Sequence, residues 1–541
     1  MNTKYFILPA LGLAASVGLS GCYEMDTIPM DQYVTEGEKV AAVEANPEKA
    51  QAAIAGITAL FSGCMQILGE DANVHSDIGF PGLMLSSDSR GIDLVSESTG
   101  YNWFSSQVEM NDCSKTAYYT RFTWGNAYRQ IFACNAAFKN LDPETEDPEI
   151  QFYLGQAHGF RAYDYFLLAQ TYQFTYKGNE DKACVMIITE ENEEEATANG
   201  CPRSTVAEVY KQIVEDCDKA IEYISKSQLQ PENILESKPK RFLSLAAAYG
   251  LRARVNLVMN NWAEALADAQ AAIANFRGAP LSISAASQPG FGDITASNWM
   301  LGIAIATTDR VVTSGIVNFP SHMGSFSYGY CSVGAWRRVN VNLYNAIPNT
   351  DCRKGWFLNK DSESVNLTEA QQNYCEANKM PAYTQVKFAP YQDVLGTSEN
   401  ACDIPLMRIE EMYLIAAEAK AMGGDPQGAS QDLVAFVSTY RDPKYKFSSN
   451  VKEEVQNEVW MQRRVELYGE GLSYFDLMRL NKPFDRIGAG FQEEYTYNIQ
   501  PGDPVLLLCI PETEENGNKA FSAADNNNPA PMPTPVTGTE N

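Results

Sequence analysis

The chain has 541 residues and is strongly acidic, with a formal net charge of -27. This charge argues against nucleic acid and against an anionic membrane surface as partners, because both are negative themselves. Only three histidines occur, and no two cysteines have the Cys-x-x-Cys spacing of zinc ribbons and thioredoxin-like sites. We therefore expect no metal centre and no cofactor, while the sequence leaves open whether a structural calcium ion binds.

The first 40 residues have the pattern of an export signal followed by a membrane anchor. One lysine precedes an apolar run over 5–18, which is shorter than the roughly 20 residues that cross a bilayer. Leu19-Ser20-Gly21-Cys22 follows and resembles a bacterial lipobox, where the leader is cleaved and the cysteine lipidated. We predict a signal peptide over 1–21, lipidation of Cys22 and a tether over 22–40. The alternative is an ordinary secretory peptide that leaves this cysteine free.

Helical periodicity dominates residues 41–276, which we predict to form a scaffold of helical hairpins that also carries an early ligand loop. The segment 150–172 places apolar residues three and four positions apart, as a helix with a buried face does. Thr205 and Glu208 have the spacing of a capping box at the start of the next helix. Residues 241–276 have the pattern of two Ala-rich helices broken at two asparagines, and such a pair needs stacked neighbours to bury its apolar face.

The second half of the chain changes character twice. Residues 277–401 lack a sustained helical period and are rich in Pro, Gly, Ser, Asn and aromatic residues, so we predict a loop-rich insertion with short strands. Helices return over 402–522, where Gly-Gly-Asp-Pro forms the turn of a helix pair spanning 405–440. The polar, Pro-rich tail over 523–541 is predicted to be extended or disordered.

Three segments resemble, in the same chain order, the signature of the SusD/RagB family of nutrient-binding outer-membrane lipoproteins of Bacteroidetes. They are PLMRIEEMYLIAAEAKAMGGD (405–425), MQRRVELYGEGLSYFDLMRL (461–480) and Asp-Cys-Arg-Lys (351–354) after Leu-Tyr. Gln462 and Ser473-Tyr474 depart from the family pattern, which often has Glu and Arg-Trp there.

This resemblance implies a mostly α fold, an α-α superhelix of tetratricopeptide-like hairpins with the loop-rich insertion; a generic helical bundle is the alternative. It also implies a surface-exposed lipoprotein of the cell outer membrane that hands nutrient to a SusC-like TonB-dependent barrel. Glycan is the expected ligand. The first alternative is the same capture role for peptides or another non-glycan nutrient. The remote alternative is a surface glycosidase or protease.

Catalysis is not expected, because no nucleophile elbow, zinc-protease, P-loop or Rossmann motif occurs. The only tempting pair of carboxylates is Glu466 and Glu470, which we place on one helix with Arg463, Asp476 and Arg479. Spacing of three or four residues suits ion pairing across helical turns. We therefore interpret this group as a scaffold network and predict that the protein is not an enzyme.

A glycan-binding surface needs exposed aromatic rings for sugar C–H faces and polar groups that orient hydroxyls. Two loop stretches fit this need. The candidate ligand-binding residues of the first are Asp88, Arg90, Tyr101, Asn102 and Trp103. Those of the second are Phe326, Tyr328, Tyr330 and Trp336. The alternative for both tryptophans is a role as buried anchors, and the sequence does not identify the glycan.

Overall fold

The computed structural model of the protein describes residues 47–528 and 532–536. The predicted signal peptide, the lipidation site Cys22 and the tether lie outside the described residues. Within the described ranges, no helix is both long and apolar enough to cross a membrane.

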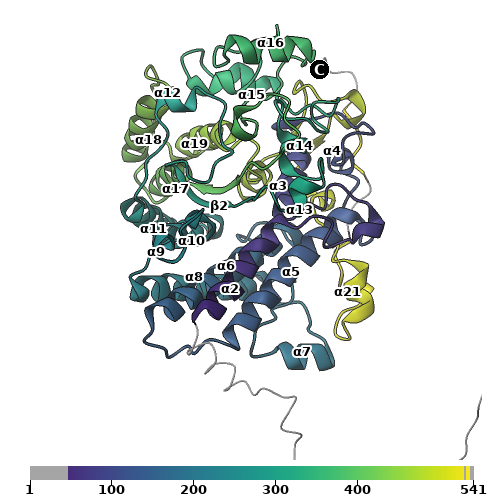
Figure 1. Ribbon diagram of the computed structural model, residues 1–541, viewed down its shortest axis with the longest axis vertical. Helices are drawn as coiled ribbons and strands as arrows, with labels where there is room; N and C mark the ends of the chain where they lie inside the picture. The colour runs from purple at the N-terminus through teal and green to yellow at the C-terminus, as the bar shows by residue number, and fades with distance from the viewer. Residues whose placement is uncertain (1–46, 529–531, 537–541) are drawn as a thin grey trace, which may run out of the picture.

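Long helices pack side by side in a curved stack that forms most of the molecule (Figure 1). Each helix contacts the next one in the series α5, α6, α8, α10, α11 and α17. Helix α17 in turn contacts both α18 and α19. The bounds are α2 (Pro47–Ala59), α5 (Tyr118–Phe138), α6 (Pro148–Tyr172), α8 (Val206–Ser227), α10 (Leu245–Met259), α11 (Trp262–Asn275), α17 (Ile409–Met422), α18 (Pro426–Tyr440) and α19 (Lys452–Glu466). Helix α11 packs directly on α17 although residues 276–408 separate them in the chain. The predicted mostly α superhelix is confirmed.

Local sequence signals set the ends of these helices. The Asp147 carboxylate caps α6 by accepting two backbone N–H groups of its first turn. Thr205 and Glu208 form the predicted capping box of α8. Asn260 takes a left-handed conformation with φ of 62° and ends α10 at the predicted break.

The insertion between α11 and α17 consists of loops with short helices and strands, as predicted. Its helices are α12 (Ile283–Ala286), α13 (Arg310–Thr313), α14 (Phe319–Met323), α15 (Val341–Ala346) and α16 (Glu369–Ala377). The other short helices are α3 (Phe80–Arg90), α4 (Ser105–Val108), α7 (Glu193–Asn199), α9 (Pro231–Ile234), α20 (Ser473–Arg479) and α21 (Glu512–Gly517).

The described residues form three antiparallel strand pairs, and the first two connect distant parts of the chain. They are β1 (Leu94–Val95) with β3 (Arg338–Val339), β2 (Trp299–Ile303) with β4 (Ile404–Arg408), and β5 (Phe484–Asp485) with β6 (Asn498–Ile499). The first pair places the region after α3 next to the insertion. The second pair ties the insertion to the start of α17.

Two predicted helices are wrong in part. Residues 405–408 belong to strand β4 and not to a helix. The segment 461–480 is not one helix, because α19 ends at Glu466 and α20 begins only at Ser473. Between them Gly469 and Gly471 have φ of 77° and 78°, a backbone conformation that favours glycine and ends helical geometry.

The tail prediction is also wrong for the first residues of the tail. Residues 523–525 form a single 3-10 turn. Asn526 then donates to the Ile510 carbonyl at 2.9 Å, and Asn527 donates to the Tyr172 carbonyl at 2.8 Å. These hydrogen bonds fasten the beginning of the tail to the helical stack.

The eleven described cysteines are all free thiols, and nine of them are buried. They therefore serve as small apolar core residues in the structure.

Candidate ligand-binding site

The β1–β3 pair brings the two aromatic stretches predicted from the sequence together. The ring centroids of Trp103 and Tyr330 lie 6.3 Å apart at an interplanar angle of 70°. His75 joins them: its ring stacks on Trp103 at 4.6 Å and hydrogen-bonds the Tyr330 hydroxyl through Nδ1. Trp103 and His75 are half-buried, whereas Tyr330 is buried. Part of Trp103 therefore remains exposed, while His75 and Tyr330 hold its ring in place.

A buried arginine and two neutral histidines form the base of this aromatic cluster: Arg337 lies over the Phe104 ring at 5.6 Å, and its Nε donates to the His322 carbonyl at 2.9 Å. Tyr330 stacks on His322 at 4.9 Å, and His322 meets the edge of Phe104 at 5.1 Å. Burial lowers the pKa of His322 to about 3, and its Nε2 donates to the His75 carbonyl at 2.9 Å. Burial lowers the pKa of His75 as well. Neither histidine is expected to carry charge at neutral pH.

A cavity of about 430 Å³ lies beside the cluster, with Trp103 in its wall. This volume is within the range of about 300–1,000 Å³ typical of small-molecule pockets. Its polar lining comprises Ser76, Ser86, Asn102, Ser105, Ser106, Gln107, Asn111, Asp112, Ser114 and Thr116. Tyr118, 53% exposed, lines the same cavity and presents a second aromatic ring to solvent. We call this feature the Trp103 cavity.

Two deeply buried side chains in the lining keep polar atoms without partners. The Asp112 Oδ2 and Gln107 Oε1 atoms make no hydrogen bond to any described residue, although Asp112 is only 1% exposed and Gln107 only 6% exposed. The other carboxylate oxygen of Asp112 is ion-paired with Arg90. Leaving a buried polar atom unpaired costs roughly 1–3 kcal/mol. Both atoms are shielded from solvent, so the hydrogen-bonding character of the cavity comes from the serine, threonine and asparagine side chains of its lining.

Five predicted ligand residues are buried, and their expected exposure is corrected: besides Tyr330 and Asn102, they are Asp88, Arg90 and Phe326. Asp88 accepts a hydrogen bond from the Gly471 N–H at 2.9 Å, and burial raises its pKa to about 7. Arg90 pairs with Asp112, and Phe326 is fully buried in a small hydrophobic cluster. The sequence did not reveal this because α3, which carries Asp88 and Arg90, is buried along nearly its whole length.

The remaining candidates occupy different environments. Asn102 is buried and organises the early loop, because its Nδ2 donates to the Glu97 carbonyl at 2.7 Å. Tyr101 and Tyr328 are 57% and 52% exposed. Trp336 is half-buried and packs with the Phe326 cluster, away from the aromatic cluster. A ligand contact at any of these residues stays a prediction.

Sequence reasoning missed His75, Gln107 and Asp112. The only signal for the last two is the polar composition of residues 105–116, which precede α5. Nothing in the sequence links His75 to Tyr330, because that contact depends on how the insertion folds back.

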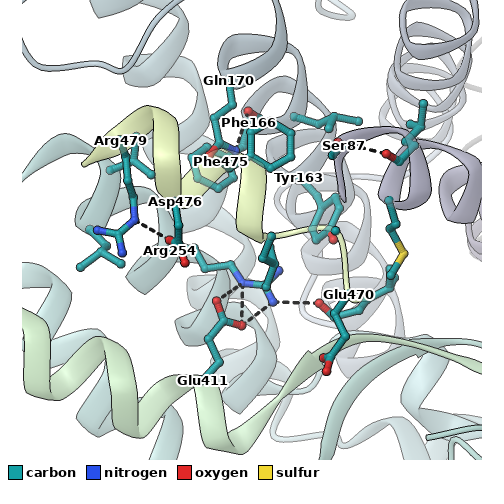
Figure 2. A pocket seen from close by; sticks show the side chains of 18 of the residues that line it. Ser87, Tyr163, Phe166, Gln170, Arg254, Glu411, Glu470, Phe475, Asp476 and Arg479 are labelled. Carbon is teal, nitrogen blue, oxygen red and sulfur yellow. Dashed lines mark hydrogen bonds and ion pairs between the residues drawn. The ribbon is translucent and has the colours of Figure 1, made fainter. Parts of the chain in front are cut away.

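A second cavity, of about 70 Å³, lies between α3, α6, α10 and α20 and is lined by ion pairs (Figure 2). Arg254 contacts Glu411, with the Nε–Oε1 distance at 3.0 Å, and Arg479 Nε lies 2.7 Å from Asp476 Oδ1. Glu470, also in the lining, pairs with Arg408 at 2.8 Å. Salt bridges of the signature segments thus close this space.

Glu466 and Glu470, the pair of carboxylates weighed for catalysis, belong to the same network. Glu466 lies 2.7 Å from Arg441 Nε and 3.0 Å from Arg408 Nη1, and it is fully buried. Burial would raise the pKa of Glu466, but Arg441 and Arg408 lower it well below its usual value. Glu470 behaves likewise, with Arg408 and Lys387 as its partners. An acid held ionised in this way is a poor proton donor, which supports the scaffold interpretation.

Comparisons with known proteins agree with this architecture. Residues 84–257 match the SusD-like_3 model, described as starch-binding associating with outer membrane, and residues 353–530 match the SusD_RagB model of the SusD family. The SusD-like protein P38 of Formosa agariphila is 27% identical over 141 residues, which span 24% of this chain and 28% of that protein.

Solved structures share the fold over nearly the whole chain. A SusD-like carbohydrate binding protein from Bacteroides vulgatus has a TM-score of 0.72 at 22% identity, covering 88% of this chain and 97% of that one. The surface glycan-binding protein A from Bacteroides thetaiotaomicron, solved with laminarihexaose, has a TM-score of 0.60 at 17% identity, covering 87% and 98%. The two family models, matched over residues 84–257 and 353–530, show that the chain belongs to the SusD/RagB family.

Proposed function

We propose that the protein binds a polysaccharide or oligosaccharide at the Trp103 cavity and the adjoining aromatic cluster. The observation that carries this proposal is that Trp103 belongs to both features. A sugar ring offers apolar C–H faces to an aromatic ring and hydroxyls to polar side chains. Family members solved as carbohydrate-binding and laminarihexaose-bound proteins support glycan as the ligand class.

The binding step follows from the geometry of the site. Trp103 is held by His75 and Tyr330, so little side-chain entropy is lost when a sugar ring stacks on it. Hydroxyls of the same sugar unit then reach the serine, threonine and asparagine side chains of the lining. Exposed Tyr118 offers a contact for the neighbouring unit.

The setting of this binding step is part of the proposal. The protein is a lipoprotein anchored through Cys22 on the outer face of the outer membrane, where it delivers its ligand to a SusC-like TonB-dependent barrel. Tethering keeps the captured ligand at high local concentration next to the transporter. The protein contributes binding and not turnover, because the prominent carboxylates are engaged in ion pairs.

Affinity electrophoresis of the protein without its first 22 residues tests this function. Laminarin, starch and xylan are the neutral polysaccharides of the panel, and polygalacturonate and chondroitin sulfate are the acidic ones. We expect retardation by at least one glycan, loss of retardation in Trp103→Ala, and no effect of Trp262→Ala, a half-buried tryptophan on α11. No retardation by any glycan would move the ligand to the peptide class, and glycan hydrolysis by the purified protein would contradict the binding role.

A further inference from the structure

A cavity of about 490 Å³ lies between the end of α2, the end of β2 and the start of α13 (Figure 1). It shares no lining residue with the Trp103 cavity. Its walls are largely apolar, and the buried residues Phe61, Ile303 and Leu406 form part of them. The volume is within the range of about 300–1,000 Å³ typical of small-molecule pockets. We call this feature the Arg241 cavity.

The charged groups of this cavity are unequally matched. Lys238, Arg241 and Arg310 supply three cations to the lining. Lys238 Nζ lies 2.7 Å from Asp403 Oδ1, and Arg310 pairs with Glu70. Each of these two cations therefore has its own carboxylate.

Arg241, the last residue of the turn Pro239–Arg241, has no such partner. Among the residues that the structure describes, none accepts a hydrogen bond from its guanidinium or forms an ion pair with it. Asp309 carries the only carboxylate of the described lining, and it instead accepts the Ala306 N–H at 2.8 Å. The Arg241 Nε is shielded from solvent, but the residue as a whole is only half-buried, so its terminal nitrogens stay accessible from the cavity. Burial without an anion beside it lowers the pKa of Arg241.

The shape and charge of this guanidinium determine which ligand it suits. A guanidinium is a planar fork of N–H donors that matches the two oxygens of a carboxylate. One unpaired cation balances one negative charge, whereas a phosphate monoester carries about -1.5 to -2 at pH 7. Apolar walls strengthen such a pair, because they lower the local dielectric constant. Ser62, Ser237 and Gln66 in the same lining offer neutral partners for hydroxyls.

From this arrangement we infer that the Arg241 cavity is a second binding site, which takes a small hydroxyl-bearing carboxylate of about the size of a uronic acid. The carboxylate lies against the terminal nitrogens of Arg241, and the rest of the molecule occupies the space between α2 and β2. This inference does not depend on the proposed function, because Trp103 takes no part in the cavity.

Isothermal titration calorimetry of the purified protein with glucuronate and with glucose tests this inference. The two sugars differ only at C6, where glucuronate carries the carboxylate. We expect glucuronate to bind more tightly than glucose by at least about 10-fold, which corresponds to about 1.4 kcal/mol. A buffer with about 0.15 M NaCl screens the long-range repulsion from the net charge of -27.

Variants of Arg241 assign the binding to this cavity. Arg241→Gln removes the cation and should abolish the preference for glucuronate, whereas Arg241→Lys keeps the charge without the planar fork and should retain part of it. Arg277→Gln, at an exposed position outside the lining, is the matched control and should leave both affinities unchanged. Trp103→Ala should also leave glucuronate binding intact. Circular dichroism checks that each variant is folded.

Three results would contradict the second site. Equal binding of glucuronate and glucose, or a preference that survives in Arg241→Gln, would overturn it. Loss of glucuronate binding in Trp103→Ala would overturn it too, because the sugar acid would then occupy the Trp103 cavity. Tighter binding of glucose 6-phosphate than of glucuronate, lost in Arg241→Gln, would overturn the assignment of a carboxylate.

Discussion

At the scale of single residues, the most heavily charged part of the interior surrounds Glu466. This carboxylate meets three arginines, Arg353, Arg408 and Arg441, all of them fully buried. Desolvating these charges is costly, and their mutual attraction offsets that cost only while every partner is present. The network therefore acts mainly by fixing how β4, α18, α19 and the insertion pack together. Its contribution to the net free energy of folding is smaller.

Replacing Glu466 by Gln tests this network. The substitution leaves three buried guanidinium groups short of a counter-charge and should lower the free energy of unfolding by about 3–5 kcal/mol. Glu222→Gln removes a carboxylate from an exposed pair with Lys226 and should cost less than about 1 kcal/mol. Urea denaturation followed by circular dichroism measures both, and equal losses would contradict the account.

Asp88 should make stability depend on pH. Burial raises its folded pKa to about 7, above the ordinary value of 3.8, so the folded state binds a proton that the unfolded state releases. The stabilisation is fully present below about pH 4 and is lost as pH rises through about 7. Relative to Asp88→Asn, the wild type should lose on the order of 4 kcal/mol between pH 4 and pH 8.

The measurement for Asp88 is the difference in unfolding free energy between the two proteins across this pH range. A difference that does not change with pH would show that the carboxyl is ionised throughout and would refute the expected protonation.

Prediction of single residues from the sequence succeeded for the aromatic side chains, because their residue type limits the environments in which they occur. Trp103 and Tyr330 were both candidates, and they do lie together. Asp88 and Arg90 were wrongly predicted to be exposed. The sequence around an aspartate or arginine in a polar segment does not show whether the folded chain supplies a partner that allows its burial. Arg90 can be buried because Asp112, 22 residues later, and the Val505 carbonyl lie beside it as partners.

At the scale of elements, close helix packing depends on small residues at the contacts. A Cβ atom at Gly155 of α6 would lie 2.6 Å from Ile224 Cγ1 of α8, closer than side-chain atoms approach in proteins. On the outer surface of α2, a Cβ atom at Gly56 would meet nothing within 4 Å. The same residue type therefore has opposite energetic roles at the two positions.

Alanine substitution at these glycines gives a matched pair. Gly56→Ala should raise the free energy of unfolding by about 0.5–1 kcal/mol, because alanine favours the helix and nothing obstructs its methyl group. Gly155→Ala should lower it by about 1–3 kcal/mol through overpacking against α8. Thermal or urea unfolding of both variants checks this, and stabilisation by both would show that α6 and α8 are less tightly packed than described.

The long helices could be predicted because their caps and apolar spacing are local signals, as at Thr205 and Asn260. The break between α19 and α20 was missed because Glu466 and Glu470 keep helical spacing while Gly469 and Gly471 turn the chain. Strand β4 was missed because its pairing partner β2 is 105 residues away, as counted from Trp299 to Ile404. Such pairings are not visible in a local pattern.

At the scale of the whole molecule, the helical stack is continuous from α5 to α19, and the insertion is attached to one side of it. The β1–β3 pair connects the early loop with the insertion and so assembles one site from Trp103 and Tyr330, which are 227 residues apart as counted from 103 to 330. Ligand binding across this junction should hold the insertion against the scaffold.

The central claim is that a glycan binds at the Trp103 cavity. A crystal structure of the protein with the oligosaccharide selected by the panel tests it most directly. The account predicts a sugar ring stacked on Trp103, with hydroxyls within hydrogen-bond distance of serine, threonine or asparagine side chains of the lining. A sugar bound only at another surface, such as around Tyr328, with the Trp103 cavity unchanged, would contradict it.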